Sequence, residues 1–494
     1  MAEAVNAKSA AVSGLSADWP MLEALMGGTR SMRAAKETLL PKWPAEDQES
    51  YKARLDTSTL FPALRRTVSV MVGKPFSKAL SFGDDVPVEI AGKPATKDAP
   101  AQPGWADDID REGVNLHTFA AEMFEEGLTY GLGGILVEAP KPVQPAGAVV
   151  TLAEQKAADI RPYWVRVKHN QLLGWRSKTE RGRRVLTQLR ILESETVEDG
   201  DFGEKTVERV RVLTPGAWAV WQKADKPQAG KEWELIEEGK TGLSVIPFVP
   251  IYGARRGFMN GVSPLLDLAF LNVKHWQSQS DQDNILHVAR VPILFLQGAD
   301  DKTELTLGAG SAVKGPAGSD LKWVEHTGQA IKAGQESLDA LEEQMIQAGA
   351  ELLVKKPGER SATESANDAE ANKSDLQRIV ENFEDSLDQA LYLTALYASL
   401  PQGGHVSLFK DFGAATLAAA SGQLVLSMQQ GGLISKERAI SEMKRRGELA
   451  ADVDAEDEAE KVERESMAGD EDDNEGLDDE IIDGDPPPAG GAGS

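Results

Sequence analysis

Two long helical segments on either side of a β-rich stretch constrain the fold of this chain more than any other feature. The first begins near Ser263 and Pro264, residue types that suit an N-cap and a first helical position, and extends to about residue 289. The second covers 335–354, where apolar residues recur every three to four positions. This seam is narrow enough to pack one helix on another. Residues 290–332, between the two helices, favour short strands and turns.

Parts of these helices lack an apolar stripe. The first is polar on every side from Gln277 to Asn284, and a helix that is polar all round is not held by a monomeric core. A further helix opens with capping-box spacing at Ser361 and Glu364 and runs to about Leu400, with an apolar stripe only in its second half. We therefore predict that these helices contact other copies of the chain. The seam residues of the 335–354 helix are Leu338, Leu341, Met345, Ala348 and Leu352.

The first 260 residues are expected to form one α+β body. Helical spacing of apolar residues predicts helices over 19–43, 59–71 and 116–130. Short apolar runs separated by Gly, Pro and charged turns predict antiparallel strands between residues 161 and 252. The predicted strands of the body are 135–137, 163–167, 185–192, 207–213, 217–221, 233–236 and 246–251. After residue 400, the predicted elements are a strand over 406–410 and helices over 414–429 and 435–448.

Charge is distributed unevenly along the chain. The 494 residues have a formal net charge of -26, and this length predicts more than one domain. Residues 451–494 contain 18 acidic and 2 basic residues with few large apolar ones, so we predict that they are disordered. We interpret this tail either as a solvated segment that aids solubility or as an interaction or electrostatic-exclusion segment. The acidic chain also lacks the basic footprint of a free-standing DNA-binding protein.

The motifs of common enzymes and metal sites are absent from the sequence. The chain has no cysteine, which excludes disulfides, cysteine-ligated metals and a thiol nucleophile. It has no complete phosphate-binding loop, dinucleotide fingerprint, HExxH or GxSxG motif, and its six histidines have no metal-ligand spacing. The acidic run Asp107, Asp108 and Asp110 lacks the Gly and Glu of a calcium loop. We therefore predict no catalytic residue, cofactor or metal, and no apolar run approaches the length of a membrane span.

Three stretches together resemble bacteriophage portal proteins, of a group often described only as a phage domain of unknown function. The first is 127–138 (GLTYGLGGILVE), a helix, turn and strand. The second begins at 263–269 (SPLLDLA) and continues through Ser280 and Asp281 to Val291 and Pro292. The third combines 361–364 (SATE) with 369–374 (AEANKS). The order of elements agrees over about residues 19–450, and the three motifs are specific together although each is weak alone.

The resemblance implies an α+β portal-like fold with an α/β wing, a two-helix stem, a small β-rich clip, a long wing helix and a helical crown. The implied parts are 1–260 (wing), 261–289 (stem helix), 290–332 (clip), 333–354 (second stem helix), 355–363 (tunnel loop), 364–412 (long helix and wing strand), 413–450 (crown) and 451–494 (acidic tail). In such a ring the stem residues Leu338, Leu341, Met345 and Leu352 would meet neighbouring subunits.

The resemblance also implies a function. Portal proteins form a ring of identical subunits, usually twelve, at one vertex of the phage capsid, and the ring assembles in the host cytoplasm. The ring passes double-stranded DNA during packaging and ejection. It docks the terminase large subunit, the major capsid or scaffolding protein and head-tail connector or adaptor proteins, without catalysis or membrane contact. Two alternatives stay open: another virion structural protein, such as a minor head or connector protein, and a phage hydrolase or nuclease built from dispersed carboxylates.

Three cations fall where the resemblance places the tunnel loop. Lys355, Lys356 and Arg360 are hypothesised to line the narrowest part of the channel, and the alternative is a solvated basic turn. A conduit must not hold DNA tightly, and each phosphate neutralised by Lys or Arg adds salt-dependent affinity. A largely acidic channel with few cations is therefore physically sensible. Family crowns lie at the capsid-interior end, so the acidic tail is expected to project inward. Because like charges repel around a ring, assembly is expected to depend on salt or divalent cations.

Overall fold

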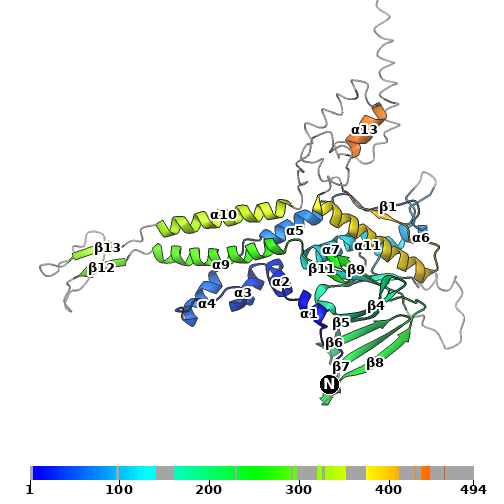
Figure 1. Ribbon diagram of the computed structural model, residues 1–494, viewed down its shortest axis with the longest axis horizontal. Helices are drawn as coiled ribbons and strands as arrows, with labels where there is room; N and C mark the ends of the chain where they lie inside the picture. The colour runs from blue at the N-terminus through cyan, green and yellow to red at the C-terminus, as the bar shows by residue number, and fades with distance from the viewer. Residues whose placement is uncertain are drawn as a thin grey trace, which may run out of the picture. The chain divides into compact units, whose positions relative to one another are not determined.

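The computed structural model of the chain has an α+β architecture, as the sequence predicted (Figure 1). It divides into two compact units, Met1–Lys410 and Asp411–Ser494. In the second unit, helix α13 (Lys436–Arg445) lies within the helix predicted over 435–448. The predicted helix over 414–429, apart from Gln429, and the acidic tail, apart from Lys461, lie outside the described residues. The residues that the structure describes are 4–95, 99–140, 161–228, 231–290, 293–297, 320–324, 329–351, 374–410, 429, 435–445 and 461.

The centre of the first unit is a three-stranded antiparallel sheet with the order β3-β2-β9. Its strands are β2 (Leu132–Glu138), β3 (Tyr163–Val167) and β9 (Phe248–Tyr252). The first six residues of β2 are all buried, and helices α7 (Leu116–Tyr130) and α11 (Asp375–Ala398) both contact this strand. A short apolar run is typical of a strand covered on both faces. The predicted helix over 116–130 and the predicted strands over 135–137 and 163–167 are confirmed.

The turn from α7 into β2 requires glycine at position 131. Gly131 ends α7 with a φ of 83°, in the left-handed region, and its N–H donates to the Gly127 carbonyl at 2.9 Å. A β-carbon on Gly131 would lie only 2.4–2.6 Å from backbone atoms of Val262 and Ser263. The backbone angle and the crowding both exclude a larger residue. Gly131 therefore lets this turn approach the segment that leads into the next long helix.

A second antiparallel sheet has five strands in the simple order β4-β5-β6-β7-β8. Its strands are β4 (Leu172–Glu180), β5 (Arg183–Asp199), β6 (Gly203–Thr214), β7 (Ala217–Gln228) and β8 (Lys231–Lys240). The strands predicted over 185–192, 207–213, 217–221 and 233–236 all lie inside β5 to β8, and their predicted antiparallel pairing is confirmed. One buried apolar cluster contains residues of both sheets. It includes Leu132, Leu136, Val167, Leu172, Leu189, Ile191, Leu213 and Phe248.

Short helices precede and connect the strands. They are α1 (Ala10–Leu15), α2 (Trp19–Gly27), α3 (Thr29–Ala34), η1 (Lys36–Thr38), α4 (Gln48–Thr57), α5 (Ala63–Gly73), α6 (Val88–Ala91), η2 (Trp105–Asp108) and η3 (His169–Gln171). The single helix predicted over 19–43 is wrong, because Gly28, with a φ of 78°, separates α2 from α3. The helix predicted over 59–71 is confirmed as α5, although it begins only after Pro62. The sequence analysis missed α4, whose buried apolar residues are only Tyr51 and Leu55.

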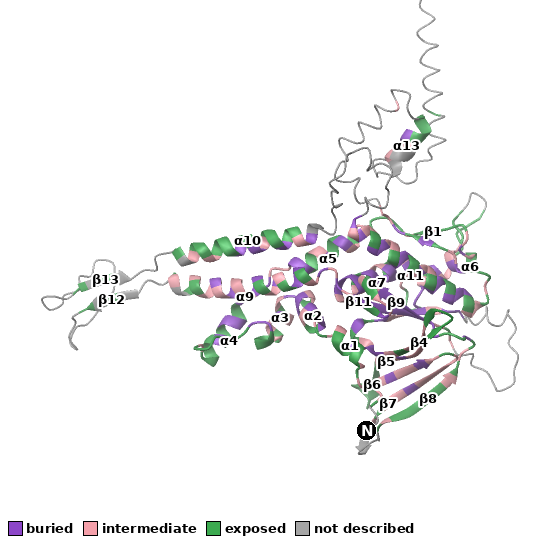
Figure 2. Cartoon of the chain, viewed as in Figure 1, coloured by how far each residue is buried: buried purple, intermediate pink, exposed green. Residues whose placement is uncertain are grey.

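Helix α11 packs through the apolar stripe that the sequence predicted for its second half. Its buried residues include Leu376, Val380, Phe383, Leu387, Ala390 and Thr394. The Phe383 ring meets Phe124 of α7 edge to face, with centroids 5.2 Å apart. Trp164 of β3 is fully buried, and its indole N–H donates to Thr394 Oγ1 at 2.8 Å. Figure 2 shows buried residues concentrated around α7, α11 and β9, which is the core of this unit.

Two small antiparallel pairings complete the body. Strand β10 (Ala254–Gly257) pairs with β11 (Asn260–Val262), and β1 (Ser81–Phe82) pairs with β14 (Val406–Ser407). The strand predicted over 406–410 is therefore present but shorter. Beside the β1–β14 pairing, Asp85 accepts hydrogen bonds from the backbone N–H and the ring Nδ1 of His405. The hydrogen bond to Asp85 raises the pKa of His405, and the same bond lowers the pKa of Asp85.

The Asp85–His405 pair predicts a pH window for the β1–β14 pairing. Because the pKa of His405 is raised on folding, its contribution is present at low pH and is lost as pH rises through the folded pKa. Because the pKa of Asp85 is lowered, its contribution is lost as pH falls through that lower value. Amide hydrogen exchange at 81–83 and 405–407, corrected for intrinsic rates, should therefore be slowest between the two pKa values. Asp85→Asn should flatten this profile, and an unchanged profile in the variant contradicts the role of the pair.

Candidate functional site: the long helix pair

Helices α9 (Leu266–Ala289) and α10 (Gln329–Glu351) form a long pair beside the body (Figure 1). They have 24 and 23 residues, which corresponds to about 36 and 34 Å at 1.5 Å per residue, and they contact each other. Between them in the sequence, β12 (Ile293–Gln297) pairs antiparallel with β13 (Asp320–Val324). The predicted order of helix, short strands and helix over 261–354 is confirmed for the described residues.

Ser263 fixes the start of α9, as its sequence context predicted. Its hydroxyl donates to the Leu128 carbonyl of α7 at 2.9 Å and accepts from the Leu265 N–H at 3.2 Å. Pro264 lies in the turn directly before the first helical residue, Leu266. The side chain therefore satisfies one free N–H of the new helix and ties that helix to α7.

A buried amide joins α9 to the start of α5. Asn272 is fully buried, its Oδ1 accepts from the Leu64 N–H at 3.0 Å, and its Nδ2 donates to the Phe61 carbonyl at 2.9 Å. Leu64 lies in the first turn of α5, where backbone N–H groups have no partner within the helix. Asn272 thus supplies a cap from a residue more than 200 positions away, and no local sequence signal predicts it.

The apolar seam of α10 is covered within a single chain. Leu338, Leu341 and Met345 are only 2–3% exposed, and α10 contacts α9 and α5. The prediction that this seam packs helix on helix is therefore confirmed for these three residues. Leu352 lies outside the described residues. The assignment of all four residues to an interface between subunits stays a prediction.

The polar half of α9 corrects an expectation from the sequence. We expected residues 277–284 to face other copies, yet Ser280 and Gln282 are buried in one chain. Ser280 is hydrogen-bonded to the Ser58 hydroxyl at 2.8 Å, and Gln282 donates to the Ile331 carbonyl at 2.9 Å. Gln277 donates to the Leu39 carbonyl at 3.0 Å. This half is thus partly held within one chain, because residues 39–58 and the start of α10 supply polar partners that hydrophobic periodicity cannot reveal. Contact of its remaining residues with other copies stays a prediction.

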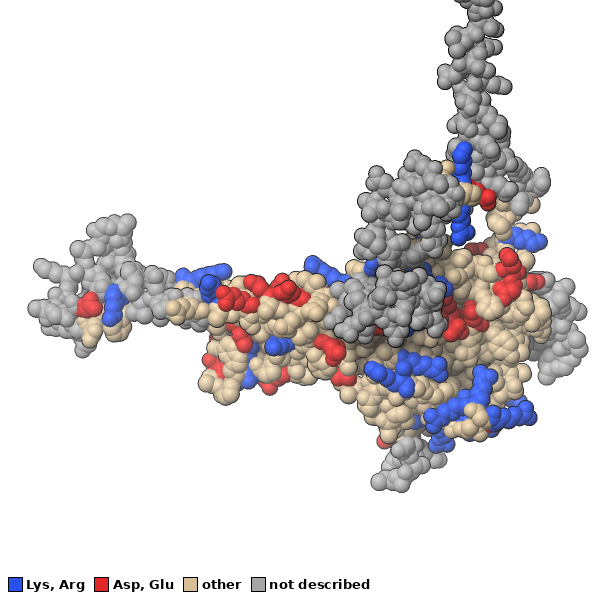
Figure 3. Space-filling view, turned by 45° about the horizontal axis from the view of Figure 1, so that its top comes forward, with Lys and Arg blue, Asp and Glu red and all other residues tan. Residues whose placement is uncertain are grey.

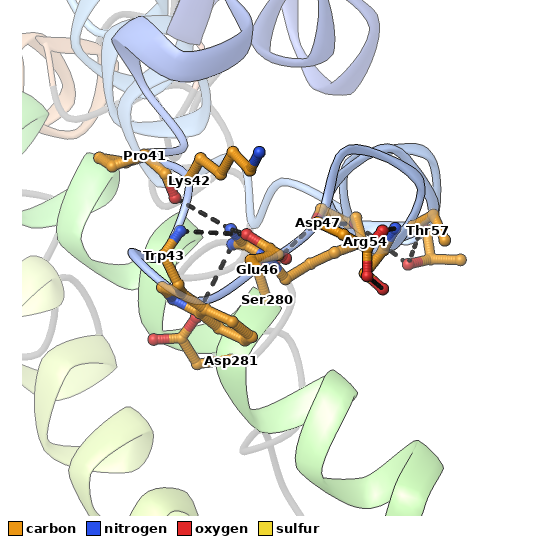
Figure 4. A network of polar contacts seen from close by, with 12 residues as sticks. Pro41, Lys42, Trp43, Glu46, Asp47, Arg54, Thr57, Ser280 and Asp281 are labelled. Atoms are coloured by element: carbon orange, nitrogen blue, oxygen red, sulfur yellow. Dashed lines mark hydrogen bonds and ion pairs between the residues drawn. The ribbon is translucent and has the colours of Figure 1, made fainter.

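Arg54 of α4 is the centre of this polar contact (Figure 4). Its guanidinium binds both carboxylate oxygens of Glu46 at 2.7 and 2.8 Å and donates to the Pro41 carbonyl at 2.9 Å. It stacks over the Trp43 ring with Cζ 4.1 Å from the centroid, and it lies 3.9 Å from Asp281 of α9. The hydrogen bonds from Arg54 hold the pKa of Glu46 below its ordinary value, whereas burial raises the pKa of Asp281. Arg54 and Glu46 are both buried and form a bidentate pair.

Removal of Arg54 should strongly destabilise the chain. Arg54→Met leaves Glu46 charged, buried and without its partner, so we expect a loss of about 3 kcal/mol in the free energy of unfolding. The double variant Arg54→Met, Glu46→Leu should recover part of this loss, because no unpaired charge remains. Urea unfolding followed by tryptophan fluorescence measures both quantities.

Lys52→Met is the matched control, because Lys52 lies on the same helix and is exposed; its effect should stay within about 0.5 kcal/mol.

Because the pKa of Glu46 is lowered on folding, the contribution of the pair is lost as pH falls through that pKa. The stabilities of the wild-type and Arg54→Met chains should therefore converge in acid. Equal effects of the Arg54 and Lys52 substitutions contradict this role of the pair.

The acidic run before α7 makes local structural contacts. Asp107 accepts from the Gly104 N–H at 2.9 Å, and Asp110 accepts from the Glu112 and Val114 N–H groups at 2.9 and 3.1 Å. Asp108 pairs with Arg161 at 2.8 Å. These carboxylates cap turns and bind a guanidinium, which is a different arrangement from the converging oxygens of a calcium loop.

His169 is a buried histidine in contact with two carboxylates. Its two ring nitrogens lie 2.6 Å from Glu126 and 3.0 Å from Glu23, and the ring stacks on Tyr130 with centroids 3.5 Å apart. Burial raises the pKa of Tyr130 well above its ordinary value. These contacts tie α2, α7 and η3 together, so the geometry assigns His169 a structural position.

The described residues give no indication of a metal or catalytic centre. They contain no group of three or more His, Asp or Glu side chains placed to hold a metal ion. Two surface clefts, of about 760 and 450 Å³, lie beside α6 and beside α1. Their described lining residues do not combine a nucleophile with a neighbouring base. No helix in the described part of the chain has the length and apolar character needed to cross a membrane.

The predicted channel cations cannot be located by the structure. Lys355, Lys356 and Arg360 lie outside the described residues, which end at Glu351 and resume at Ser374. Their role in a tunnel loop therefore stays a prediction. The capping-box spacing at 361–364 also lies in this interval, and α11 instead begins with a capping box of Ser374 and Gln377.

The sequence analysis missed a concentration of cations on the five-stranded sheet. The turn between β4 and β5 and the strand ends beside it carry five exposed basic side chains, which we call the basic hairpin. Figure 3 shows Lys and Arg gathered on the part of the visible face that carries this sheet. A local count of 176–184 (RSKTERGRR) would have revealed the group, because five of nine residues are basic. The residues of the basic hairpin are Arg176, Lys178, Arg181, Arg183 and Arg184.

Comparisons with known proteins match the helix pair and the body. A family model described as a domain of unknown function, DUF4055, matches residues 264–398, which contain α9, β12, β13, α10 and α11. No curated protein sequence matches the chain.

Several solved structures of a gene transfer agent are also similar to the chain. One is the neck of the empty particle computed with C6 symmetry, with a TM-score of 0.41, 13% identity and coverage of 76% of this chain and 88% of that chain. The neck of the native particle computed with C12 symmetry has a TM-score of 0.41, 14% identity and the same coverage. The virion of the native particle has a TM-score of 0.39, 14% identity and coverage of 84% and 97%.

Proposed function

We propose that the chain is the subunit of a phage portal ring. The observation that carries the proposal is the helix pair α9–α10, which encloses the β12–β13 pairing in the sequence and is anchored on an α+β body at Ser263. This order, followed by the long helix α11, agrees with the stem, clip, stem and wing helix implied by the resemblance drawn from the sequence. The family model that matches 264–398 spans the same elements.

The proposed ring would act as a conduit at one capsid vertex. It would pass double-stranded DNA during packaging and ejection, and it would dock the terminase large subunit, capsid or scaffolding protein and head-tail connectors. Its proposed role is mechanical and positional, without catalysis. The net charge of -26 supports a channel that DNA does not adhere to, because a largely acidic surface limits the number of phosphates that the ring neutralises.

Exposed apolar residues on the helix pair supply proposed contacts between subunits. Phe270 and Ile285 of α9 are 52% and 37% exposed, and Ile346 of α10 is 69% exposed. In the proposed ring these exposed apolar side chains would be covered by a neighbouring subunit. The seam of Leu338, Leu341 and Met345, which is also proposed to meet neighbouring subunits, would stiffen the pair because its side chains are covered within one chain.

Ring formation is the direct test of the proposal. Negative-stain imaging and light scattering of the full chain should show closed rings of about twelve subunits with a central hole. Because each acidic subunit repels its neighbours, raising the salt concentration or adding a divalent cation should promote assembly. Ile346→Glu should shift assembly to about tenfold higher protein concentration, because a charge would enter the interface.

Gln347→Glu is the matched control, since it adds the same charge at the next exposed position of α10. It should leave assembly close to wild type. A chain that stays monomeric under every salt condition would contradict the proposed function. Equal effects of the two substitutions would contradict the assignment of Ile346 to the interface.

The three tunnel-loop cations are proposed to guide DNA in the channel. Replacing Lys355, Lys356 and Arg360 with Gln removes three phosphate-binding charges from each subunit, so we expect less DNA packaged or retained per particle. The measurement is the DNA content of purified phage particles. The control replaces the exposed cations Lys52, Lys332 and Arg378 with Gln. DNA content that equals the control is the result that rejects the channel role.

A further inference from the structure

The basic hairpin places five cations on a rigid support. Glu180 lies opposite Arg183 in the β4–β5 ladder, so Arg181 and Gly182 form a two-residue turn. Both turn residues have positive φ, 49° and 79°, which is typical of the tight turns that match strand twist. Ladder pairing extends from this turn to Leu172 opposite Ile191, with register shifts between Arg176 and Ser177 and between Leu172 and Gly174. The cations therefore occupy fixed positions along about 17 Å of strand, from Arg176 to the turn.

Most of these cations lack an acidic partner. Lys178 pairs with Glu180, the single acidic residue within 176–184. Among the described residues, no carboxylate forms an ion pair with Arg176, Arg181, Arg183 or Arg184. In a chain with 79 acidic and 53 basic residues, four neighbouring arginines without a counter-charge are unexpected. Their mutual repulsion would be relieved by an anionic partner.

A neighbouring turn extends the basic surface. The Arg184 guanidinium lies 6.0 Å from the centroid of the Phe258 ring, which places the β10–β11 turn beside the hairpin. Strand β10 adds two exposed arginines, Arg255 and Arg256. Arg255 stacks over Tyr252 at 5.2 Å, so it too is held by an aromatic ring and not by a carboxylate. Because side chains alternate along a strand, Arg184 and this turn lie on the face of the ribbon opposite to Arg176, Lys178 and Arg183, so the seven basic side chains flank both faces of the ribbon.

The chemistry of the surface favours a phosphate backbone over a protein partner. None of the large apolar side chains exposed in the described chain lies within 172–190 or 254–262, so a protein partner would find no fully exposed apolar anchor there. Six of the seven basic residues are arginines, whose planar fork binds phosphate oxygens in pairs. A two-stranded β-ribbon also fits the major groove of DNA, which is about 12 Å wide.

We propose that the basic hairpin, with Arg255 and Arg256, binds the phosphate backbone of double-stranded DNA. The contact is electrostatic and independent of base sequence, so it weakens steeply with salt and permits DNA to slide. The acidic remainder of the chain does not cancel it, because charges more than about 8 Å away are largely screened at physiological ionic strength. This site is additional to the proposed channel cations and uses different residues.

Fluorescence anisotropy with a labelled 24-base-pair duplex tests the proposal on the full chain. We compare wild type with a variant in which Arg176, Arg181, Arg183 and Arg184 are all replaced by Gln. At about 50 mM salt, the variant should bind the duplex at least about tenfold more weakly. The slope of log affinity against log salt should fall by about 3 to 4, since four phosphate contacts are removed. Circular dichroism and the thermal midpoint establish that the variant is folded.

Two further variants make the result specific. Replacing the same four arginines with Lys keeps the charge and should retain most of the affinity. Replacing the exposed cations Arg30, Lys36, Lys52 and Arg65 with Gln changes net charge equally and should leave affinity near wild type. Equal losses in both Gln variants overturn the proposal, as does unchanged binding in the hairpin variant. Displacement of the duplex by poly-glutamate at equal charge concentration also overturns it, in favour of an acidic protein partner.

The outcome is separable from that of the proposed ring. Negative-stain imaging of the same samples reports assembly independently of DNA binding. If the wild-type chain forms normal rings but binds DNA no better than the hairpin variant, the basic hairpin is rejected as a DNA site and the portal proposal is unaffected. If the chain forms no rings but binds DNA at the hairpin in a salt-sensitive way, the basic hairpin stands as a DNA site and the portal proposal is rejected.

Discussion

The rest of the structure depends on a backbone junction that leaves no room for side chains. The N–H of Gly253 donates to the Gly131 carbonyl at 3.1 Å, and a β-carbon on Gly261 would lie 2.3 Å from that same oxygen. Immediately after this contact, Ser263 binds the Leu128 carbonyl and α9 begins. Helix α7, strand β2 and strand β9 therefore meet through main-chain atoms, and the Ser263 hydroxyl joins the start of α9 to them. The long helix pair is aligned with the core because this junction is tight.

Local patterns in the sequence predicted the parts of the fold that depend on local periodicity. Helix α7, the apolar stripe of α11 and strands β5 to β8 followed from the spacing of apolar residues, whereas strand β4 was not predicted. Helix α4 was missed because Tyr51 and Leu55 give it too weak a stripe. The predicted helix over 19–43 was too long because the conformation of Gly28 is set by its surroundings.

The sequence predicted the candidate site in outline, but one interpretation of its residues was wrong. Its two helices, the strands between them and the Ser263 cap were all visible in the sequence. The polar side of α9 was assigned to other copies because its partners, Ser58 and the Leu39 carbonyl, come from more than 200 residues earlier. Asn272 and Arg54 act through similar long-range polar contacts. Hydrophobic periodicity contains no information about such contacts, because they are directional and specific to one arrangement of the chain.

The polar contacts of α9 have a mechanical consequence. Hydrogen bonds weaken steeply as the donor and acceptor lose alignment, so they fix the relative position of the groups that they join. Gln277, Ser280 and Asp281 each engage a different partner within residues 39–58. These contacts hold residues 39–58 and α9 in one register. A force applied along α9 reaches the N-terminal helices directly, without passing through either sheet.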